Sequence, residues 1–193
     1  MDKNIFSIPN LLSLLRVVLV PVLIVAVCFR EASWFLLVLA ISLLSDMLDG
    51  YFARKLNQVT EFGARLDSWA DMATYAMMIV GLYYIWPLIF IDQFFYLVAA
   101  TLSYVLPVVI AVIRFSHFPS YHTWGAKIAA VLIAPAFYLL VLADNQIFFR
   151  LVIVFHVIVA VEEIAITFLL KKPKTNVASI LTILAHRENK LRD

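Results

Sequence analysis

The sequence has 193 residues with a formal net charge of +2, and 64% of its residues are hydrophobic. This composition excludes a soluble domain built around one core and is typical of an integral membrane protein. The small net charge gives no argument for nucleic-acid binding, and the single cysteine, Cys28, cannot form an internal disulfide.

Six apolar runs predict six membrane-spanning helices, because a span requires about 20 mostly apolar residues. Met1–Ser7 is too short and too mixed for a cleavable signal peptide, so we expect the first run to remain as a span. The expected fold is therefore all-α, an integral membrane protein with six transmembrane helices. We expect one domain over residues 1–193, with a helical bundle at 8–172 and a cytoplasmic tail at 173–193. The six runs are 9–28, 34–53, 66–86, 94–113, 126–143 and 147–170.

Lysine and arginine lie mainly in the segments 54–65 and 114–127 and in the tail, whereas the opposite loops have only Arg30 and Arg150 near them. Cytoplasmic loops of membrane proteins are enriched in these two residue types. We therefore expect both termini, and the aspartates at 46–71 around the 54–65 segment, to face the cytoplasm, in a multi-pass protein of the cell (inner) membrane.

The first run opens with Pro9-Asn10-Leu11-Leu12-Ser13-Leu14-Leu15-Arg16, which places Arg16 seven residues inside an apolar segment. One interpretation is structural: a long basic side chain can extend from such a position to the nearby headgroup layer. The other interpretation is a contact with a phosphate group, since charges within membrane segments mark functional sites by default.

The segment 46–71 contains four aspartates with an apolar run on either side: Asp46, Asp49, Asp67 and Asp71. Residues three or four apart share a helix face, so each pair of aspartates should lie together. Four carboxylates this close need a positive partner to stay ionised, and oxygen ligands suit hard cations such as Mg2+ or Mn2+. The alternative, helix caps or solvated loop charges, gives no reason for the shared faces. Small residues lie next to both pairs of aspartates: Gly50, Ala53 and Gly63. They would let a bulky ligand approach the helix backbone.

Basic and hydroxyl residues gather between the fourth and fifth runs, on the same expected side of the membrane as the aspartates. They form either an anion pocket for a phosphorylated or carboxylated substrate or ordinary cytoplasmic positive charge. In the sixth run, we interpret His156, Glu162 and Glu163 as structural pairing or a subunit interface in preference to catalysis. The apolar residues of the tail are typical of either a helix on the membrane surface or a frayed end.

The pattern Asp46-x2-Asp49-Gly50-x2-Ala53-Arg54-x8-Gly63-x3-Asp67-x3-Asp71 resembles the signature of the CDP-alcohol phosphatidyltransferase family at all eight specified positions. The N-terminal stretch is similar to the family's opening Pro-Asn-x-x-Thr-x-x-Arg, with Ser13 in place of the threonine and the hydroxyl kept. The hydropathy layout extends the resemblance to most of the remaining chain.

This resemblance implies an enzyme of phospholipid synthesis that moves a phosphatidyl group from CDP-diacylglycerol to the hydroxyl of a small polar alcohol and releases CMP. It implies Mg2+ or Mn2+ held by Asp46, Asp49 and Asp67, with Asp71 as the catalytic base and a further metal ligand. The residues implied for binding the donor are Asn10, Ser13, Arg16, Gly50, Ala53, Arg54 and Gly63. Those implied for the acceptor are Arg114, His122 and Lys127. The expected partners are the two substrates, the lipid bilayer and a second copy of the chain in a homodimer, with no nucleic acid.

The acceptor stays open among glycerol 3-phosphate, serine and inositol phosphate. Members that use glycerol 3-phosphate often have proline after the third aspartate and lysine after the fourth, where this chain has Ser68 and Met72. The run Phe62–Ser68 is similar to serine-using members, which often continue differently from Met72–Tyr75. An alternative of another class is a small cation transporter in which the acidic cluster forms the ion path. This alternative gives no role to the glycine, alanine and arginine positions of the signature.

Overall fold

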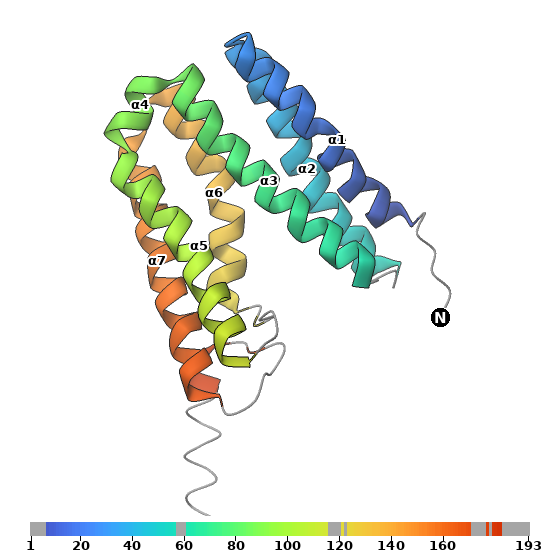
Figure 1. The fold of residues 1–193 in the computed structure, drawn as a ribbon, viewed down its shortest axis with the longest axis vertical. Coiled ribbons are helices and arrows are strands. Elements are labelled where there is room, and N and C mark those ends of the chain that lie inside the picture. The colour runs from blue at the N-terminus through green and yellow to red at the C-terminus, as the bar shows by residue number, and fades with distance from the viewer. Residues whose placement is uncertain are drawn as a thin grey trace, which may run out of the picture. The chain divides into compact units, whose positions relative to one another are not determined.

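The computed structural model describes residues 7–56, 61–115, 121, 123–170, 177 and 179–182, apart from the side chains of 53, 54, 61, 62 and 64. This part of the chain is helical and contains no strand (Figure 1), which confirms the all-α prediction. The helices are α1 (Ile8–Cys28), α2 (Ala32–Lys55), α3 (Glu61–Ile85), α4 (Pro87–Asp92), α5 (Phe94–Phe115), α6 (Trp124–Ala143) and α7 (Gln146–Leu169).

Within the described residues, five helical segments are long and apolar enough to cross a membrane, so the chain is a multi-pass membrane protein. They are α1, residues 32–52 of α2, α5, α6 and α7. Helix α3 has the length of a span, with 25 residues, but Asp67, Asp71 and several other polar residues make it less apolar. The number of six spans and the cytoplasmic side of both termini stay predictions.

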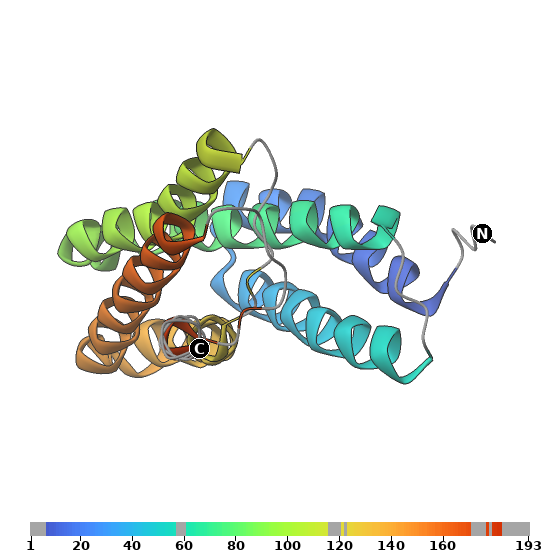
Figure 2. The same cartoon turned by 90° about the horizontal axis from the view of Figure 1, so that it is seen from below.

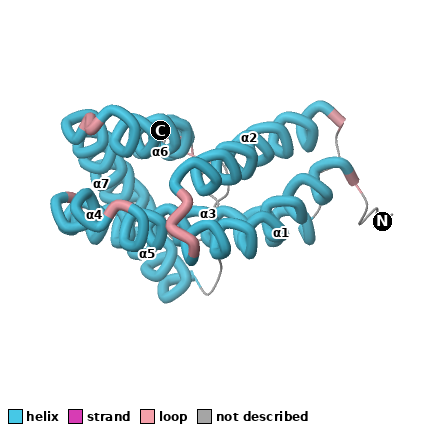
Figure 3. Tube along the Cα trace, turned by 90° about the horizontal axis from the view of Figure 1, so that it is seen from above, coloured by secondary structure: helices cyan, strands magenta, loops and turns pink. Residues whose placement is uncertain are grey.

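The chain forms two compact units, Met1–Asp92 and Gln93–Asp193; the expectation of one domain over the whole chain stays a prediction. In the first unit, α1 packs against both α2 and α3, whereas α2 and α3 contact each other less (Figure 3). Apolar side chains from all three helices are buried there, among them Leu23, Leu39 and Leu82. Helix α1 therefore joins the two helices that carry the aspartates.

Local hydrogen bonds define both ends of α1. At the start, Ser7 Oγ accepts a hydrogen bond from the backbone N–H of Asn10 at 3.4 Å, as expected for a serine that caps a helix. At the other end, Arg30 has a left-handed φ of 54°. The N–H groups of Arg30 and Glu31 donate to the carbonyls of residues 27 and 26 at 3.0 and 2.9 Å. This Schellman-type turn ends α1 and returns the chain as α2.

In the second unit, α7 packs against both α5 and α6 (Figure 2). Thr123 Oγ1 caps α6 by accepting from the N–H of Ala126 at 3.1 Å. Asp144, with a left-handed φ of 47°, ends α6, and Asn145 Oδ1 accepts from the N–H of Phe148 at 3.0 Å to begin α7. The tight connection explains why α6 and α7 pack as neighbours.

Two polar side chains of α7 have structural contacts, the kind of role that the sequence predicts for them. Nδ1 of His156 is hydrogen-bonded to the carbonyl oxygen of Val152 at 2.9 Å. Glu162 Oε1 accepts a hydrogen bond from the backbone N–H of Ile180 at 3.0 Å. The second contact ties the C-terminal segment to the helix.

The described part of the C-terminal segment packs against the end of α7. Val177 is buried in a small apolar cluster with Tyr121 and Ile166, and Ile180 packs against the same cluster. The hydroxyl of Tyr121 also shares a hydrogen bond with that of Thr167 at 2.9 Å. Most of the predicted tail, 173–193, lies outside the described residues, but this part of it belongs to the second unit.

Candidate metal centre

Contacts between α2 and α3 set the register that brings the aspartates together. Phe35 lies against Gly81, where a Cβ atom would be only 2.4 Å from Cζ of the phenylalanine ring. Ser42 and Thr74, seven residues further along α2 and seven back along α3, share a hydrogen bond of 3.2 Å. The helices therefore run in opposite directions, and the next helical turn places the four aspartates beside one another.

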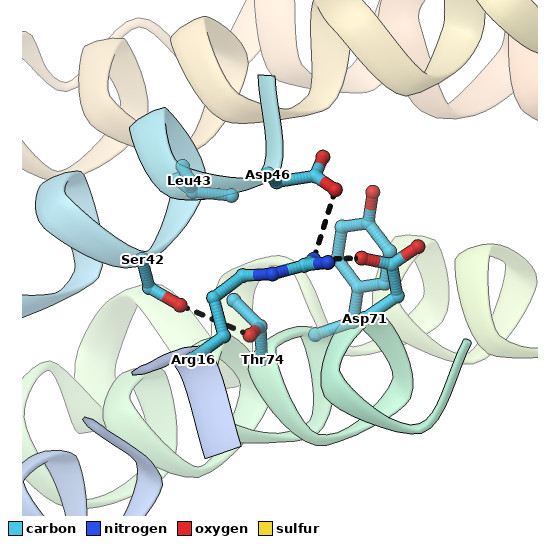
Figure 4. Close-up of a pocket in the computed structure, with 7 residues that line it drawn as sticks. Arg16, Ser42, Leu43, Asp46, Asp71 and Thr74 are labelled. Carbon is cyan, nitrogen blue, oxygen red and sulfur yellow. Dashed lines mark hydrogen bonds and ion pairs between the residues drawn. The ribbon is translucent and has the colours of Figure 1, made fainter. Parts of the chain in front are cut away.

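Three of the four carboxylates converge on one point. One oxygen atom from each of Asp46, Asp49 and Asp67 lies within 4.8 Å of the other two. The fourth carboxylate, that of Asp71, lies beside this set and lines a small cavity with Asp46 and Thr74 (Figure 4). The structure thus brings all four aspartates into one cluster. Their roles, metal ligation by all four and proton acceptance by Asp71, stay predictions.

Arg16 of α1 forms ion pairs with all four aspartates. Its Nη1 is 2.8 Å from Asp46 Oδ1 and its Nη2 is 2.8 Å from Asp49 Oδ2. The guanidinium also pairs with Asp67 through Nη2 and with Asp71 through Nη1, and Figure 4 shows the contacts with Asp46 and Asp71. The side chain is only 1% exposed. The side chain points at the carboxylates. It does not extend toward a headgroup layer, as one of the two interpretations of Arg16 expected.

The carboxylate cluster is closed on one side and open on the other. The Asp49 side chain is 8% exposed and accepts a hydrogen bond from the buried Ser13 Oγ at 2.9 Å. The side chains of Asp46 and Asp67 are each 39% exposed. A ligand would therefore reach the cluster past Asp46 and Asp67, with Asp49 held at its inner end.

The carboxylate oxygens of the cluster are suitable ligands for a divalent cation. Four ionised aspartates and one arginine would give the cluster a net charge of −3, and like charges this close repel one another. The ligand atoms are all carboxylate oxygens, the type that Mg2+ and Mn2+ prefer. Asp46, Asp49 and Asp67 are thus able to hold such an ion, while the identity of the ion stays a prediction.

The cavity beside Arg16 is small, and the arginine side chain forms part of its lining. It has a volume of about 10 Å³ and is lined by residues of α1, α2 and α3. This volume corresponds to about one water molecule. With Arg16 in this position, the cavity itself has no room for a phosphate, whereas the exposed side of Asp46 and Asp67 stays open.

The predicted donor-binding residues fall into three groups. Ser13 and Arg16 contact the carboxylate cluster directly, and Asn10 is buried one turn earlier on α1. Gly50 and Gly63 lie on α2 and α3, on the helices of the aspartates. Ala53 and Arg54 lie on α2, but their side chains are outside the described residues. Contact of these groups with a nucleotide stays a prediction.

The predicted acceptor-binding residues belong to the second unit. Arg114 Nη2 donates to the carbonyl of Phe168 at 3.4 Å, and its guanidinium lies 5.4 Å from the centre of the same residue's ring. Nζ of Lys127 lies 4.9 Å from the ring centre of Trp124. His122 lies outside the described residues. Their role in acceptor binding stays a prediction.

Sequence analysis did not identify Ser42 and Thr74, which line the cavity and hydrogen-bond across it. A signal for them exists in the spacing. Ser42 lies four residues before Asp46, and Thr74 lies three residues after Asp71, so each continues the helix stripe of its neighbouring aspartate.

A comparison with protein-family models matches residues 6–185 to the family described as CDP-alcohol phosphatidyltransferase. The chain is also similar to curated proteins named CDP-diacylglycerol--glycerol-3-phosphate 3-phosphatidyltransferase. The one from Salmonella choleraesuis is 42% identical over 79 residues, which cover 39% of this chain and 43% of that protein. The one from Pseudomonas fluorescens is 41% identical over 78 residues, which cover 38% and 40%.

The protein of the same name from Escherichia coli K12 is 39% identical over 79 residues, which cover 39% of this chain and 43% of that protein. The aligned segment thus spans less than half the length of these curated relatives. No solved structure matches the chain significantly.

Proposed function

Because this chain belongs to the CDP-alcohol phosphatidyltransferase family, we propose that it transfers a phosphatidyl group from CDP-diacylglycerol to the hydroxyl of a small polar alcohol, with release of CMP. The observation that carries the proposal is the convergence of Asp46, Asp49 and Asp67, whose oxygen atoms lie within 4.8 Å of one another. Asp71 lies next to that set. The signature of the family and the geometry of the cluster therefore point to the same residues.

The proposed enzyme depends on Mg2+ or Mn2+. Asp46, Asp49 and Asp67 would hold the ion, with Asp71 able to contribute a further oxygen. Such an ion supplies positive charge that binds the donor pyrophosphate and stabilises the charge that develops on it during transfer. Without that charge, the pyrophosphate and the carboxylates would repel each other.

In the proposed reaction, Asp71 accepts the proton of the acceptor hydroxyl. The hydroxyl oxygen then forms a bond to the phosphorus atom next to the lipid, and the bond from that phosphorus to the CMP oxygen breaks. CMP leaves with the electron pair of the broken bond. Ser13 holds Asp49 in place by a hydrogen bond of 2.9 Å. Placing the two substrates side by side should supply much of the rate.

Glycerol 3-phosphate is the first acceptor to test. The curated relatives carry this compound in their printed names. Against it stand Ser68 and Met72, which occupy positions where glycerol 3-phosphate-using members often have proline and lysine. Serine and inositol phosphate are therefore compared with it in the same assay.

The membrane arrangement belongs to the same proposal. We propose that α3 also spans the membrane and completes the set of six, because its 25 residues are sufficient to cross the bilayer and its aspartates lie in its first half. Both termini and the metal centre would then face the cytoplasm, where water-soluble acceptors and CMP are available. The bacterial relatives support the inner membrane as the location, and assembly as a homodimer stays a prediction.

The proposed function is tested by measuring CMP release from the purified full-length protein. CDP-diacylglycerol is supplied with radiolabelled glycerol 3-phosphate, serine or inositol phosphate in parallel reactions. Formation of a labelled lipid with one acceptor is the expected result. Cation flux in proteoliposomes without any CMP release would favour the transporter alternative instead.

We expect the activity to disappear in excess chelator and to return when Mg2+ or Mn2+ is added back. The reason is that the carboxylate cluster repels the donor pyrophosphate unless a cation lies between them. Turnover is measured before chelation, after it and after add-back, with Asp92→Asn as a matched variant because Asp92 is exposed at the end of α4. Full activity in chelator would contradict the metal-dependent mechanism.

A further inference from the structure

Arg16 and the proposed metal ion require the same carboxylate oxygens. Nη2 of Arg16 lies 2.8 Å from Asp49 Oδ2 and also pairs with Asp67, while Nη1 lies 2.8 Å from Asp46 Oδ1. These three residues are also the group that could hold a cation. The guanidinium therefore lies within the candidate metal centre.

The two positive groups cannot share this position. A guanidinium at hydrogen-bond distance from the oxygens lies where a small cation would have to coordinate, since Mg2+ binds oxygen at about 2.0–2.1 Å. Two cations so close together would repel each other strongly in a poorly solvated site. The site therefore has two exclusive states, one with the guanidinium and one with the metal ion.

We propose that Arg16 is an internal counter-ion that holds the four carboxylates together before metal binding and leaves them when the metal ion enters. This inference rests on the proposed metal-dependent function. In the first state Arg16 reduces the repulsion among the aspartates. In the second state its guanidinium is free to contact an anion, which is the phosphate contact that the sequence suggests for this residue.

Two further observations support a movable guanidinium. Nε of Arg16 is buried and has no hydrogen-bond partner among the described residues, so this position does not satisfy every donor of the side chain. The cavity between Arg16, Asp46 and Asp71 has a volume of only about 10 Å³, which is about that of one water molecule. Because Arg16 lines this cavity, movement of its side chain would enlarge it.

The competition between Arg16 and the metal ion for the same carboxylates has a measurable consequence. When the binding-competent state is only a fraction of the population, the apparent affinity for a ligand falls by that fraction. Removing Arg16 should therefore raise the metal affinity of the protein without its donor, although the carboxylates themselves are unchanged. A residue that merely supports the ligands would have the opposite effect.

The test is a Mn2+ titration of the full-length protein by calorimetry, without CDP-diacylglycerol, combined with thermal unfolding in chelator. Arg16→Gln should bind Mn2+ at least about tenfold more tightly than the wild type. Its unfolding temperature in chelator should be lower, and Mn2+ should restore it. Arg65→Gln is the matched control, because Arg65 is exposed on α3, the helix of Asp67. This variant loses the same charge and should keep wild-type metal affinity.

Unchanged or weaker Mn2+ binding by folded Arg16→Gln would overturn the inference. If Arg16→Gln fails to fold, the Mn2+ affinity of Arg16→Lys is measured instead. Lysine keeps the charge but cannot bridge carboxylates on two sides, so its Mn2+ affinity should exceed that of the wild type, and an equal affinity would overturn the inference. A wild-type protein that binds no Mn2+ would contradict the proposed metal centre itself, which is a distinguishable result.

Discussion

Replacing Asp71 with asparagine should separate donor binding from chemistry. Asp71 is not among the three residues whose oxygen atoms converge within 4.8 Å, which are Asp46, Asp49 and Asp67. The Asp71→Asn variant keeps this set and also keeps the shape of the side chain. We therefore expect it to bind metal and CDP-diacylglycerol with affinities close to those of the wild type.

The chemistry should fail because asparagine cannot accept the proton of the acceptor hydroxyl. Loss of a general base typically lowers turnover by about 100-fold or more. A 100-fold loss corresponds to about 2.7 kcal/mol of activation free energy. The variant also removes one of the four ion pairs of Arg16, which leaves the other three aspartates as partners of the guanidinium.

Donor binding by calorimetry and single-turnover CMP release should be measured on the same preparation of Asp71→Asn. Asp92→Asn, which changes an exposed residue at the end of α4, controls for the substitution type. Near-normal turnover would refute a catalytic role for Asp71. A collapse of donor affinity would instead identify Asp71 as chiefly a metal ligand.

Other predictions address the ligand set and the helix register. Asp46→Asn and Asp67→Asn should each lose metal and donor binding together, because the amide lacks the charge that holds a hard cation. Wild-type affinity for CDP-diacylglycerol in both variants, measured with metal present, would argue against the ligand assignment. Gly81→Ala should lower the free energy of unfolding by about 1–3 kcal/mol, because the new Cβ would lie 2.4 Å from the buried Phe35 ring. Thermal unfolding in detergent measures this change, and an unaltered stability would show that α2 and α3 do not depend on this contact.

The positions of the long helices could be predicted from the sequence because hydropathy reports them directly. The run 9–28 corresponds to α1 (Ile8–Cys28), and the run 94–113 corresponds to α5 (Phe94–Phe115). The short helix α4 was not predicted, since its six residues are too few for a periodic pattern to identify. The proline at its first position is a local signal for a helix start.

The candidate metal centre could be predicted in its composition but not in its geometry. Spacing places Asp46 and Asp49 on one helix face, but it does not show that the side chain of Asp49 is buried while that of Asp46 is partly exposed. Nor does spacing reveal the direction of the Arg16 side chain. Both depend on how α1 packs against α2 and α3, and hydropathy contains no information on that packing.

The docking of the C-terminal segment bears on how this protein can be shortened or tagged. A chain cut before Val177 would lose an apolar side chain from the cluster around Ile166, and Glu162 would lose the N–H of Ile180. A buried or partly buried carboxylate without its donor is costly. Expression tags and reporter fusions should therefore be placed beyond this docked segment, and trimming should preserve the chain through residue 182.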